Sequence, residues 1–234
     1  MKRIRIVGLC LIAVFALSAV AASAASAAPP EFFTCVKAVP KNTGNYTDKE
    51  CSVKASPAGT GKYERASAVG ITDSSKTKTA VLSTPAIGGK VTCKKSAGTS
   101  KITGPKSDED SVTFVDCTSE GKPCQNIGGA SGVIKTNPLL TTLVSATEEE
   151  FTALSGRGGI QAEFECGGVV IKTKGYTIGH TTSPASGHAN KKATVKFEGE
   201  TNLETEVSVV PGVFFPSEEN TTASVKYSAA LGAE

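Results

Sequence analysis

The residues and motifs that active sites commonly use are scarce in this sequence. Its 234 residues contain no Trp and only two His, and aromatic residues make up 6% of the chain. With so few rings on which a sugar could stack, the composition argues against a glycosidase. No G-x-S-x-G sequence is present, so the nucleophile elbow of an α/β-hydrolase is excluded. No cofactor fingerprint is found either, and we expect no bound cofactor.

Long apolar runs are also lacking. The longest, residues 6–20, is shorter than the ~20 residues that a membrane-spanning helix needs. It follows a positively charged start and precedes Ala25-Ser26-Ala27, an A-x-A cleavage pattern. Residues 1–27 therefore predict a signal peptide. We expect a mature chain that begins at Ala28, is secreted as an extracellular or envelope-associated protein, and keeps no stable membrane span.

The predicted mature chain carries no excess of charge, with 22 basic and 22 acidic residues. This balance argues against nucleic acid as a partner. The charges are unevenly placed: residues 28–106 hold 13 basic and 5 acidic side chains, whereas residues 107–234 hold 9 and 17. The asymmetry suggests a basic face for an anionic envelope polymer. The alternative, which we favour, is that β-pairing interleaves the two halves and mixes their charges.

Six Cys follow the predicted signal peptide, an even number that predicts three disulfides in an exported protein. Zinc ligation is disfavoured because no C-x2-C pair is present. Six Cys allow 15 pairings. Proximity along the chain predicts the pairs Cys35–Cys51 and Cys117–Cys124, which leaves Cys93 to pair with Cys166.

Alternation of apolar and polar residues is the dominant pattern, and it predicts half-buried antiparallel strands. The candidate strands, several bounded by Gly or Pro, are residues 90–95, 111–117, 132–136, 139–143, 161–166, 169–171, 192–198, 202–209 and 222–227. Gly167-Gly168 predicts a tight hairpin. Only residues 147–154 predict a helix, with Thr147 as its cap and three Glu in its first turn.

This pattern predicts an all-β fold, an antiparallel β-sandwich or barrel, with a small disulfide-held N-terminal subdomain. We expect the boundaries to fall after the signal peptide at 1–27, with a disulfide-held N-terminal segment at 28–65 and an antiparallel β domain at 66–234.

Several short motifs are similar to those of one group of proteins. They are Cys35-Val36-Lys37, Gly44-Asn45-Tyr46-Thr47-Asp48 with Cys51, Gly61-Lys62-Tyr63-Glu64, Lys101-Ile102-Thr103-Gly104-Pro105-Lys106, and Thr113-Phe114 with Cys117 and Cys124. In these motifs the chain resembles small exported proteins of high-GC actinobacteria, a group with no assigned activity. The resemblance implies export and carries over no functional residue.

Three sets of side chains are candidates for chemistry. His180 and His188 could join a carboxylate around zinc, but a third ligand is not evident and a solvated loop is favoured. Asp108-Glu109-Asp110 could bind calcium, but the preceding Gly104-Pro105 favours an exposed acidic turn. Glu163 and Glu165, at positions i and i+2 of one strand face, have a spacing compatible with glycosidase carboxylates, but an exposed sheet face is favoured.

The sequence thus assigns no catalytic, cofactor or metal residue. We expect a noncatalytic extracellular or cell-envelope module that binds a polymer or a protein, or has a structural role. The alternative is a secreted hydrolase that uses carboxylates or His180.

Overall fold

The structure, a computed structural model, describes residues 30–84, 89–181, 193–197, 201–210, 213–216 and 228–231. These residues form strands and no helix. The strands are β1 Phe33–Lys37, β2 Tyr63–Ser67, β3 Thr72–Thr77, β4 Ala80–Thr84, β5 Gly89–Ile102, β6 Ser107–Ser119, β7 Lys122–Gln125, β8 Ile134–Lys135, β9 Leu139–Leu143, β10 Glu148–Ala153, β11 Ala162–Cys166, β12 Val169–Thr181, β13 Ala193–Lys196, β14 Thr201–Val210, β15 Val213–Pro216 and β16 Ser228–Leu231.

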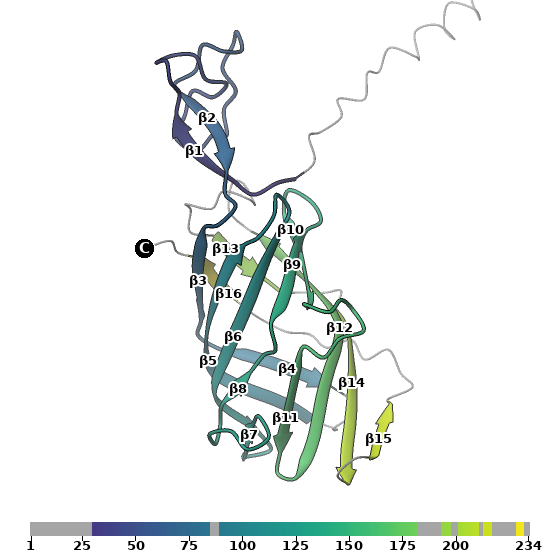
Figure 1. The fold of residues 1–234 in the computed structure, drawn as a ribbon. Helices are drawn as coiled ribbons and strands as arrows, with labels where there is room; N and C mark the ends of the chain where they lie inside the picture. Colours follow the sequence, from purple (N-terminus) through teal and green to yellow (C-terminus); the bar gives the residue numbers. More distant parts are fainter. Residues whose placement is uncertain are drawn as a thin grey trace, which may run out of the picture.

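Three long strands, β5, β6 and β12, organise the main sheet (Figure 1). Each is long enough to pair with short strands placed end to end along one edge. Strands β3 and β4 share one edge of β5, while β10 and β11 share one edge of β12. Every pairing is antiparallel, which confirms the predicted all-β antiparallel fold.

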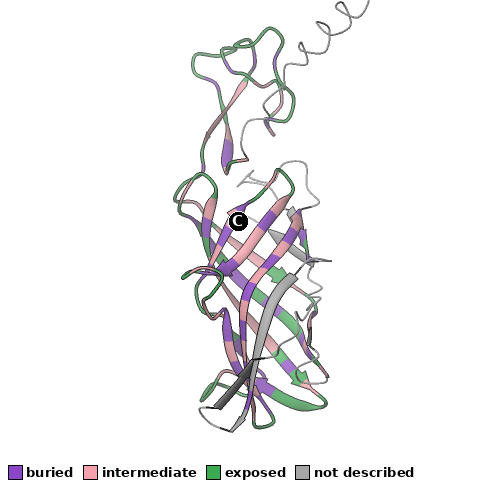
Figure 2. Ribbon diagram, turned by 90° about the vertical axis from the view of Figure 1, so that its right-hand side faces the viewer, coloured by how far each residue is buried: buried purple, intermediate pink, exposed green. Residues whose placement is uncertain are grey.

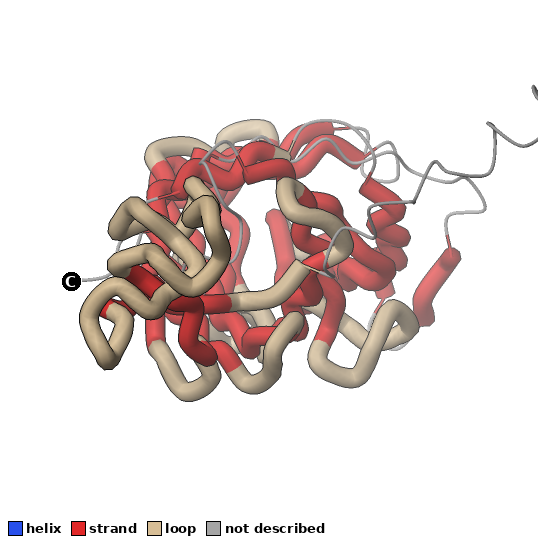
Figure 3. Tube along the Cα trace, turned by 90° about the horizontal axis from the view of Figure 1, so that it is seen from above, coloured by secondary structure: helices blue, strands red, loops and turns tan. Residues whose placement is uncertain are grey.

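The main sheet closes on itself. Strands β6 and β12 are bridged twice along their facing edges, by β9 with β10 toward one end and by β7 with β11 toward the other. The two ends of the sheet meet where β16, beyond β12 and β13, lies beside β3, beyond β5. Viewed from above, the strands surround a central space (Figure 3).

Side chains alternate between the inside and the outside of this barrel. In β12 the odd-numbered residues from Ile171 to Thr181 are buried and the even-numbered ones are partly exposed. The same alternation colours most strands in Figure 2. The lower interior is the main apolar core, and includes Val91, Ile134, Phe164 and Ile171. Alternation of apolar and polar residues in the sequence therefore indicates which face of a strand points inward.

A separate two-stranded sheet, β1 with β2, holds the N-terminal part of the described chain. The Cys35–Cys51 disulfide links β1 to the loop that precedes β2. The guanidinium of Arg65 lies over the ring of Phe33, 3.9 Å from its centroid, and 4.9 Å from that of Tyr46. The amide of Phe32 donates to the carbonyl of Pro105 at 2.6 Å, which ties this sheet to the turn between β5 and β6.

Two of the three predicted disulfide pairings are wrong. Cys35–Cys51 is confirmed, but Cys93 pairs with Cys117 and Cys124 pairs with Cys166. In each of these two disulfides the partners lie directly opposite each other on neighbouring strands, β5 with β6 and β7 with β11. Strand register, rather than distance along the chain, decides the pairing. Three disulfides indicate an oxidising compartment.

The predicted helix at residues 147–154 is also wrong, because Glu148–Ala153 is strand β10. A helix of about two turns would be marginal, whereas in β10 the backbone bonds to β9 on one side and to β12 on the other.

The tight hairpin at Gly167-Gly168 joins β11 to β12, and both glycines have positive φ, 58° and 90°. The predicted signal peptide at 1–27 and the predicted strand at 222–227 lie outside the described residues. Among the residues that the structure describes, no helix has the length and apolar character that crossing a bilayer requires.

Candidate functional site

The inward face of β6 divides the barrel interior into two regions. Val112 and Phe114, lower on the strand, line an apolar cavity. Asp108 and Asp110 have the same parity on β6 and point into the interior above it, and Asp108 is only 8% exposed. The inward face of β6 is therefore acidic near its start and apolar farther along. Residues of other strands extend the acidic region and the apolar region.

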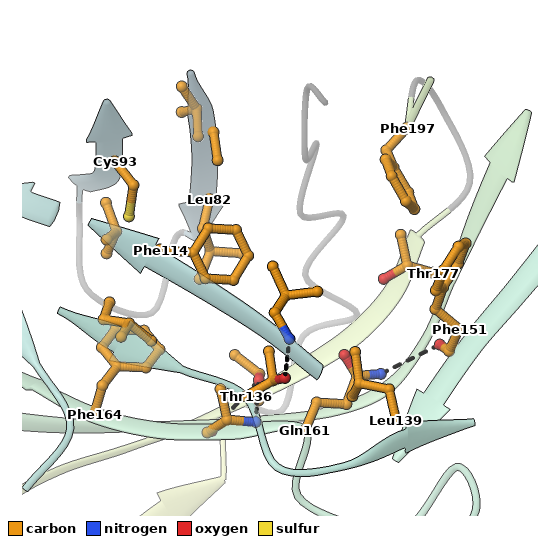
Figure 4. Close-up of a pocket in the computed structure, with 17 residues that line it drawn as sticks. Leu82, Cys93, Phe114, Thr136, Leu139, Phe151, Gln161, Phe164, Thr177 and Phe197 are labelled. Carbon is orange, nitrogen blue, oxygen red and sulfur yellow. Dashed lines mark hydrogen bonds between the residues drawn. The ribbon is translucent and has the colours of Figure 1, made fainter. Parts of the chain in front are cut away.

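The cavity has a volume of about 130 Å³. Four phenylalanines from different parts of the barrel line it: Phe114, Phe151, Phe164 and Phe197. In Figure 4 these rings enclose the space from opposite sides, with Leu82 and Leu139 between them. The rings of Phe151 and Phe197 pack with centroids 5.1 Å apart at an angle of 58°. The surface of the space suits a small apolar molecule, and its volume is slightly below the ~150 Å³ of a cavity that holds benzene.

The polar groups in the cavity wall are largely engaged with the backbone. The Gln161 amide donates to the carbonyl of Gly175 at 2.9 Å and to that of Phe151 at 3.4 Å. The hydroxyl of Thr173 donates to the carbonyl of Ala162 and accepts from its amide. The Thr136 hydroxyl accepts from the amide of Val112. These groups hold neighbouring strands together, and they leave the cavity surface mainly apolar.

Four carboxylates gather in the upper interior, and we call them the carboxylate cluster: Asp73 from β3, Asp108 and Asp110 from β6, and Glu149 from β10. Glu149 is 5% exposed. The buried hydroxyl of Thr141 on β9 donates a short hydrogen bond to Asp110. Strands β5, β9 and β12 complete the surroundings of the cluster, and Ser100 of β5 lies between Asp73 and Asp110 in the register.

Burial raises the pKa of every member of the cluster, because a carboxylate is less stable away from water than a neutral carboxyl group. Desolvation, with repulsion from Asp110 and Glu149, raises the pKa of Asp108 to about 9. Desolvation and the charge of Asp110 raise the pKa of Glu149 to about 7. Desolvation raises that of Asp110 to about 6, against the opposing hydrogen bond from Thr141. The pKa of Asp73 is raised by burial too.

The cluster has no positive partner within the described part of the chain. The ion pairs there involve Lys49, Arg157, Lys172 and His180, with none of the four carboxylates. One oxygen of Asp108 and one of Asp73 are buried without a hydrogen-bond partner. Buried charges are normally paired with a group of opposite charge. The described residues supply no such group to the carboxylate cluster.

The cavity and the carboxylate cluster adjoin. Asp110 lies opposite Leu139, which lines the cavity. Glu149 is two residues before Phe151 on β10, and Val112 is two residues after Asp110 on β6. Residues directly opposite on paired strands have Cβ atoms about 5 Å apart. Residues at i and i+2 are separated by roughly 7 Å along a strand.

The sequence prediction for Asp108-Glu109-Asp110 is corrected by this arrangement. These residues were expected in an exposed acidic turn, but the turn is confined to the residues before β6, where the amide of Gly104 donates to the carbonyl of Ser107. Strand pairing with β5 and β9 then places Asp108 and Asp110 inside the barrel and leaves Glu109 exposed.

The other candidate residues lie away from the interior. Glu163 pairs with Lys172 at 3.6 Å, and Glu165 accepts a hydrogen bond from the Gln125 amide at 2.9 Å, both on the partly exposed face of β11. His180 lies 3.6 Å from Glu148, and both are partly exposed. His188 lies outside the described residues. His180, Glu163 and Glu165 do not converge with the carboxylate cluster.

Sequence reasoning missed Asp73 and Glu149 as members of the interior. A signal for Glu149 was present, because it shares its parity with Phe151 and Ala153, the apolar residues of that stretch. The expected helix at 147–154 concealed this alternation. Asp73 lies in a polar run and gives no comparable signal.

Among the described residues, no group of three or more His, Cys, Asp or Glu is arranged so that it could hold a metal ion. No family model, curated protein or solved structure matches the chain. The resemblance to exported actinobacterial proteins therefore stays a prediction.

Proposed function

We propose that the protein is a noncatalytic extracellular or envelope-associated β-module that binds a small apolar molecule inside its barrel. The observation that carries the proposal is the cavity of about 130 Å³ enclosed by Phe114, Phe151, Phe164 and Phe197. An apolar cavity of about 150 Å³ is large enough to hold benzene. The cavity therefore has room for at most one benzene-sized ring, and any substituent of the ligand must extend beyond it.

The extracellular part of the proposal is supported by the predicted signal peptide at residues 1–27 and by three disulfides, which persist in oxidising compartments. N-terminal sequencing of the secreted protein tests it, and a start near Ala28 is expected. Recovery of the protein only as an intact precursor in the membrane fraction would contradict it.

Binding is tested with phenethyl alcohol as a neutral probe in isothermal titration calorimetry. The matched variant is Ala162→Val, which adds volume at a cavity-lining position on β11 where a β-branched residue suits the strand. We expect the wild type to bind the probe and the variant to lose at least about tenfold in affinity, with its thermal unfolding transition retained. Absence of binding to the wild type, or equal binding by a folded variant, would overturn the proposal.

The alternative, a secreted hydrolase, gains one observation from the structure. The pKa values of Asp108, Asp110 and Glu149 are raised to different extents, as in carboxyl pairs that act as acid and base. The adjoining cavity argues against it, because its apolar wall offers few groups to hold a sugar or a peptide. We expect no turnover of polysaccharide, ester or peptide substrates, and a turnover abolished by Glu149→Gln would promote the hydrolase instead.

A further inference from the structure

We propose that the ligand of the interior cavity is a hydrophobic cation, whose apolar part fills the cavity while its ammonium group lies against Asp110 and Glu149. This inference rests on the proposed function and assigns the chemical class of the ligand. It starts from the contact between the two interior regions: Leu139 and Phe151 line the cavity, and Asp110 and Glu149 are their neighbours in the sheet.

The charge of the region selects the sign of the ligand. Four carboxylates from β3, β6 and β10 converge, and the described residues supply no cation to them. The other strands around the cluster contribute uncharged groups, namely Ser100 and Ile102 from β5, Thr141 from β9 and Thr181 from β12. A ligand ammonium would supply the missing charge, and an anionic ligand would add to the repulsion.

Unpartnered polar groups provide a second, independent observation. Asp108 and Thr181 are only 8% and 7% exposed, and each has a side-chain oxygen that is buried without a hydrogen-bond partner. Both have inward parity on their strands, and Thr181 is two residues after Gly179, which pairs with Glu149. Buried acceptors are rarely left unsatisfied in proteins. An ammonium group, with its several N–H donors, matches a region that holds only acceptors and hydroxyls.

The spacing of the two regions sets the length of the ligand. Asp110 and Val112, like Glu149 and Phe151, are separated by one i, i+2 repeat, roughly 7 Å. A ring seated among the phenylalanines therefore needs a short linker to reach the carboxylates. Phenethylammonium has this shape and serves as the probe. Phenethyl alcohol and 3-phenylpropionate are its neutral and anionic counterparts of similar size.

Isothermal titration calorimetry with the three probes tests the inference on the full disulfide-bonded protein. We expect phenethylammonium to bind at least about tenfold more tightly than phenethyl alcohol, since a hydrogen bond to a charged group is stronger than a neutral one. We expect 3-phenylpropionate to bind most weakly. The preference for the ammonium should disappear in Asp110→Asn and in Glu149→Gln, while the affinity for phenethyl alcohol stays within about threefold.

Glu109→Gln is the matched control, because Glu109 lies on the same strand but is exposed on the outer face. This variant should keep the full preference. A second readout is the pH dependence: affinity for phenethylammonium should rise between pH 5 and pH 8 as the carboxylates ionise, whereas affinity for the alcohol should stay constant. Because the wild-type comparison needs no variant to fold, it is decisive by itself.

The outcomes separate the two proposals. Equal affinity for the ammonium and the alcohol would overturn the inference and leave the apolar cavity as the binding site. Binding of none of the probes would overturn the proposed function itself. An ammonium preference that survives both carboxylate variants would place the cation elsewhere. Binding of calcium alone, lost in the same two variants, would replace the organic cation with an inorganic one.

Discussion

Asp108 shows what one buried carboxylate does to the stability of this barrel. Its unfolded form ionises with an ordinary pKa of 3.8, whereas desolvation and the charges of Asp110 and Glu149 raise its folded pKa to about 9. Folding at pH 8 therefore requires Asp108 to take up a proton that the unfolded chain does not hold. The protein loses stability as pH rises above the unfolded pKa.

Replacing Asp108 with Asn should stabilise the protein at pH 8, because the amide is neutral in both the folded and the unfolded state. We expect a gain on the order of several kcal/mol in the free energy of unfolding, because each pH unit above the unfolded pKa adds about 1.4 kcal/mol to the cost of protonating Asp108 on folding. At pH 4 the gain should fall below about 1 kcal/mol, since Asp108 of the unfolded chain is then only about half ionised. Urea unfolding at the two pH values measures this. Glu109→Gln is the exposed control, and a loss of stability in Asp108→Asn at both pH values would contradict the account.

Gly179 is a second residue whose environment makes a sharp prediction. A Cβ atom there would lie 2.5 Å from Cγ1 of Val195 and 2.9 Å from Cε2 of Phe151. Gly179→Ala should therefore destabilise the protein by about 1–3 kcal/mol through overpacking. Gly158→Ala, where a Cβ would meet nothing within 4 Å, should have little effect. The thermal unfolding temperatures of the two variants test this prediction. Equal temperatures would show that Val195 and Phe151 can move to accommodate a Cβ atom at position 179.

At the scale of single elements, the sequence predicted strands well and their partners poorly. Alternation identified β9 and β11 and the hairpin into β12, because each of these strands has one face toward the core. The same rule failed at β10, where three consecutive Glu obscured the inward position of Glu149. Composition suggests that such a residue is exposed. Only the pairing with β9 and β12 shows that it is buried.

The disulfides illustrate why partners could not be predicted. Cys93 lies opposite Cys117, and Cys124 lies opposite Cys166. The pairing of Thr118 with Pro123 in the β6–β7 hairpin, continued by one residue, brings Cys117 and Cys124 together as well. Four cysteines thus share one row across β5, β6, β7 and β11. Proximity along the chain selected the two middle cysteines of this row, Cys117 and Cys124. The disulfides instead join each of them to its outer neighbour, Cys93 or Cys166.

Peptide mapping under non-reducing conditions tests the two pairings. A glutamate-specific protease is required, because Glu120 separates Cys117 from Cys124, whereas the intervening Lys122 precedes a proline. We expect one linked product that contains Cys93 with Cys117 and another that contains Cys124 with Cys166. A linked product joining Cys117 to Cys124 would show that the row is connected differently. Reduction and a second analysis of the same digest provide the control.

At the scale of the whole molecule, the closed barrel separates the acidic residues into two environments. Glu109, Glu163 and Glu165 lie on the outer face, where Glu163 has Lys172 for a partner. The carboxylate cluster lies inside. The basic and acidic parts of the sequence meet where β5 pairs with β6, but β3, β4 and β5 stay together, so the paired strands do not show the expected interleaving of the two halves. Net charge along the sequence therefore says little about the charge that the interior carries.

This separation predicts an unusual dependence of stability on pH. The raised pKa values of Asp110, Glu149 and Asp108, about 6, 7 and 9, mean that the folded protein binds more protons than the unfolded chain from about pH 4 upward. Stability should fall steadily as pH rises through these values. Asp48 acts in the opposite sense. Burial opposes its ionisation, but hydrogen bonds from Ser52 and Val53 outweigh this and lower its pKa to about 2.

The stability conferred by Asp48 is present above its unfolded pKa of 3.8 and is lost as pH falls toward 2. The two opposing trends place the stability maximum near pH 4–5, on the acidic side of neutrality. Urea unfolding measured from pH 3 to pH 9 should give this profile, and the Glu149→Gln variant should flatten its alkaline limb. Addition of phenethylammonium should flatten the same limb in the wild type, because the bound cation favours the ionised carboxylates. A stability that stays constant or rises between pH 5 and pH 8 would show that the cluster is neutralised by a group other than a proton.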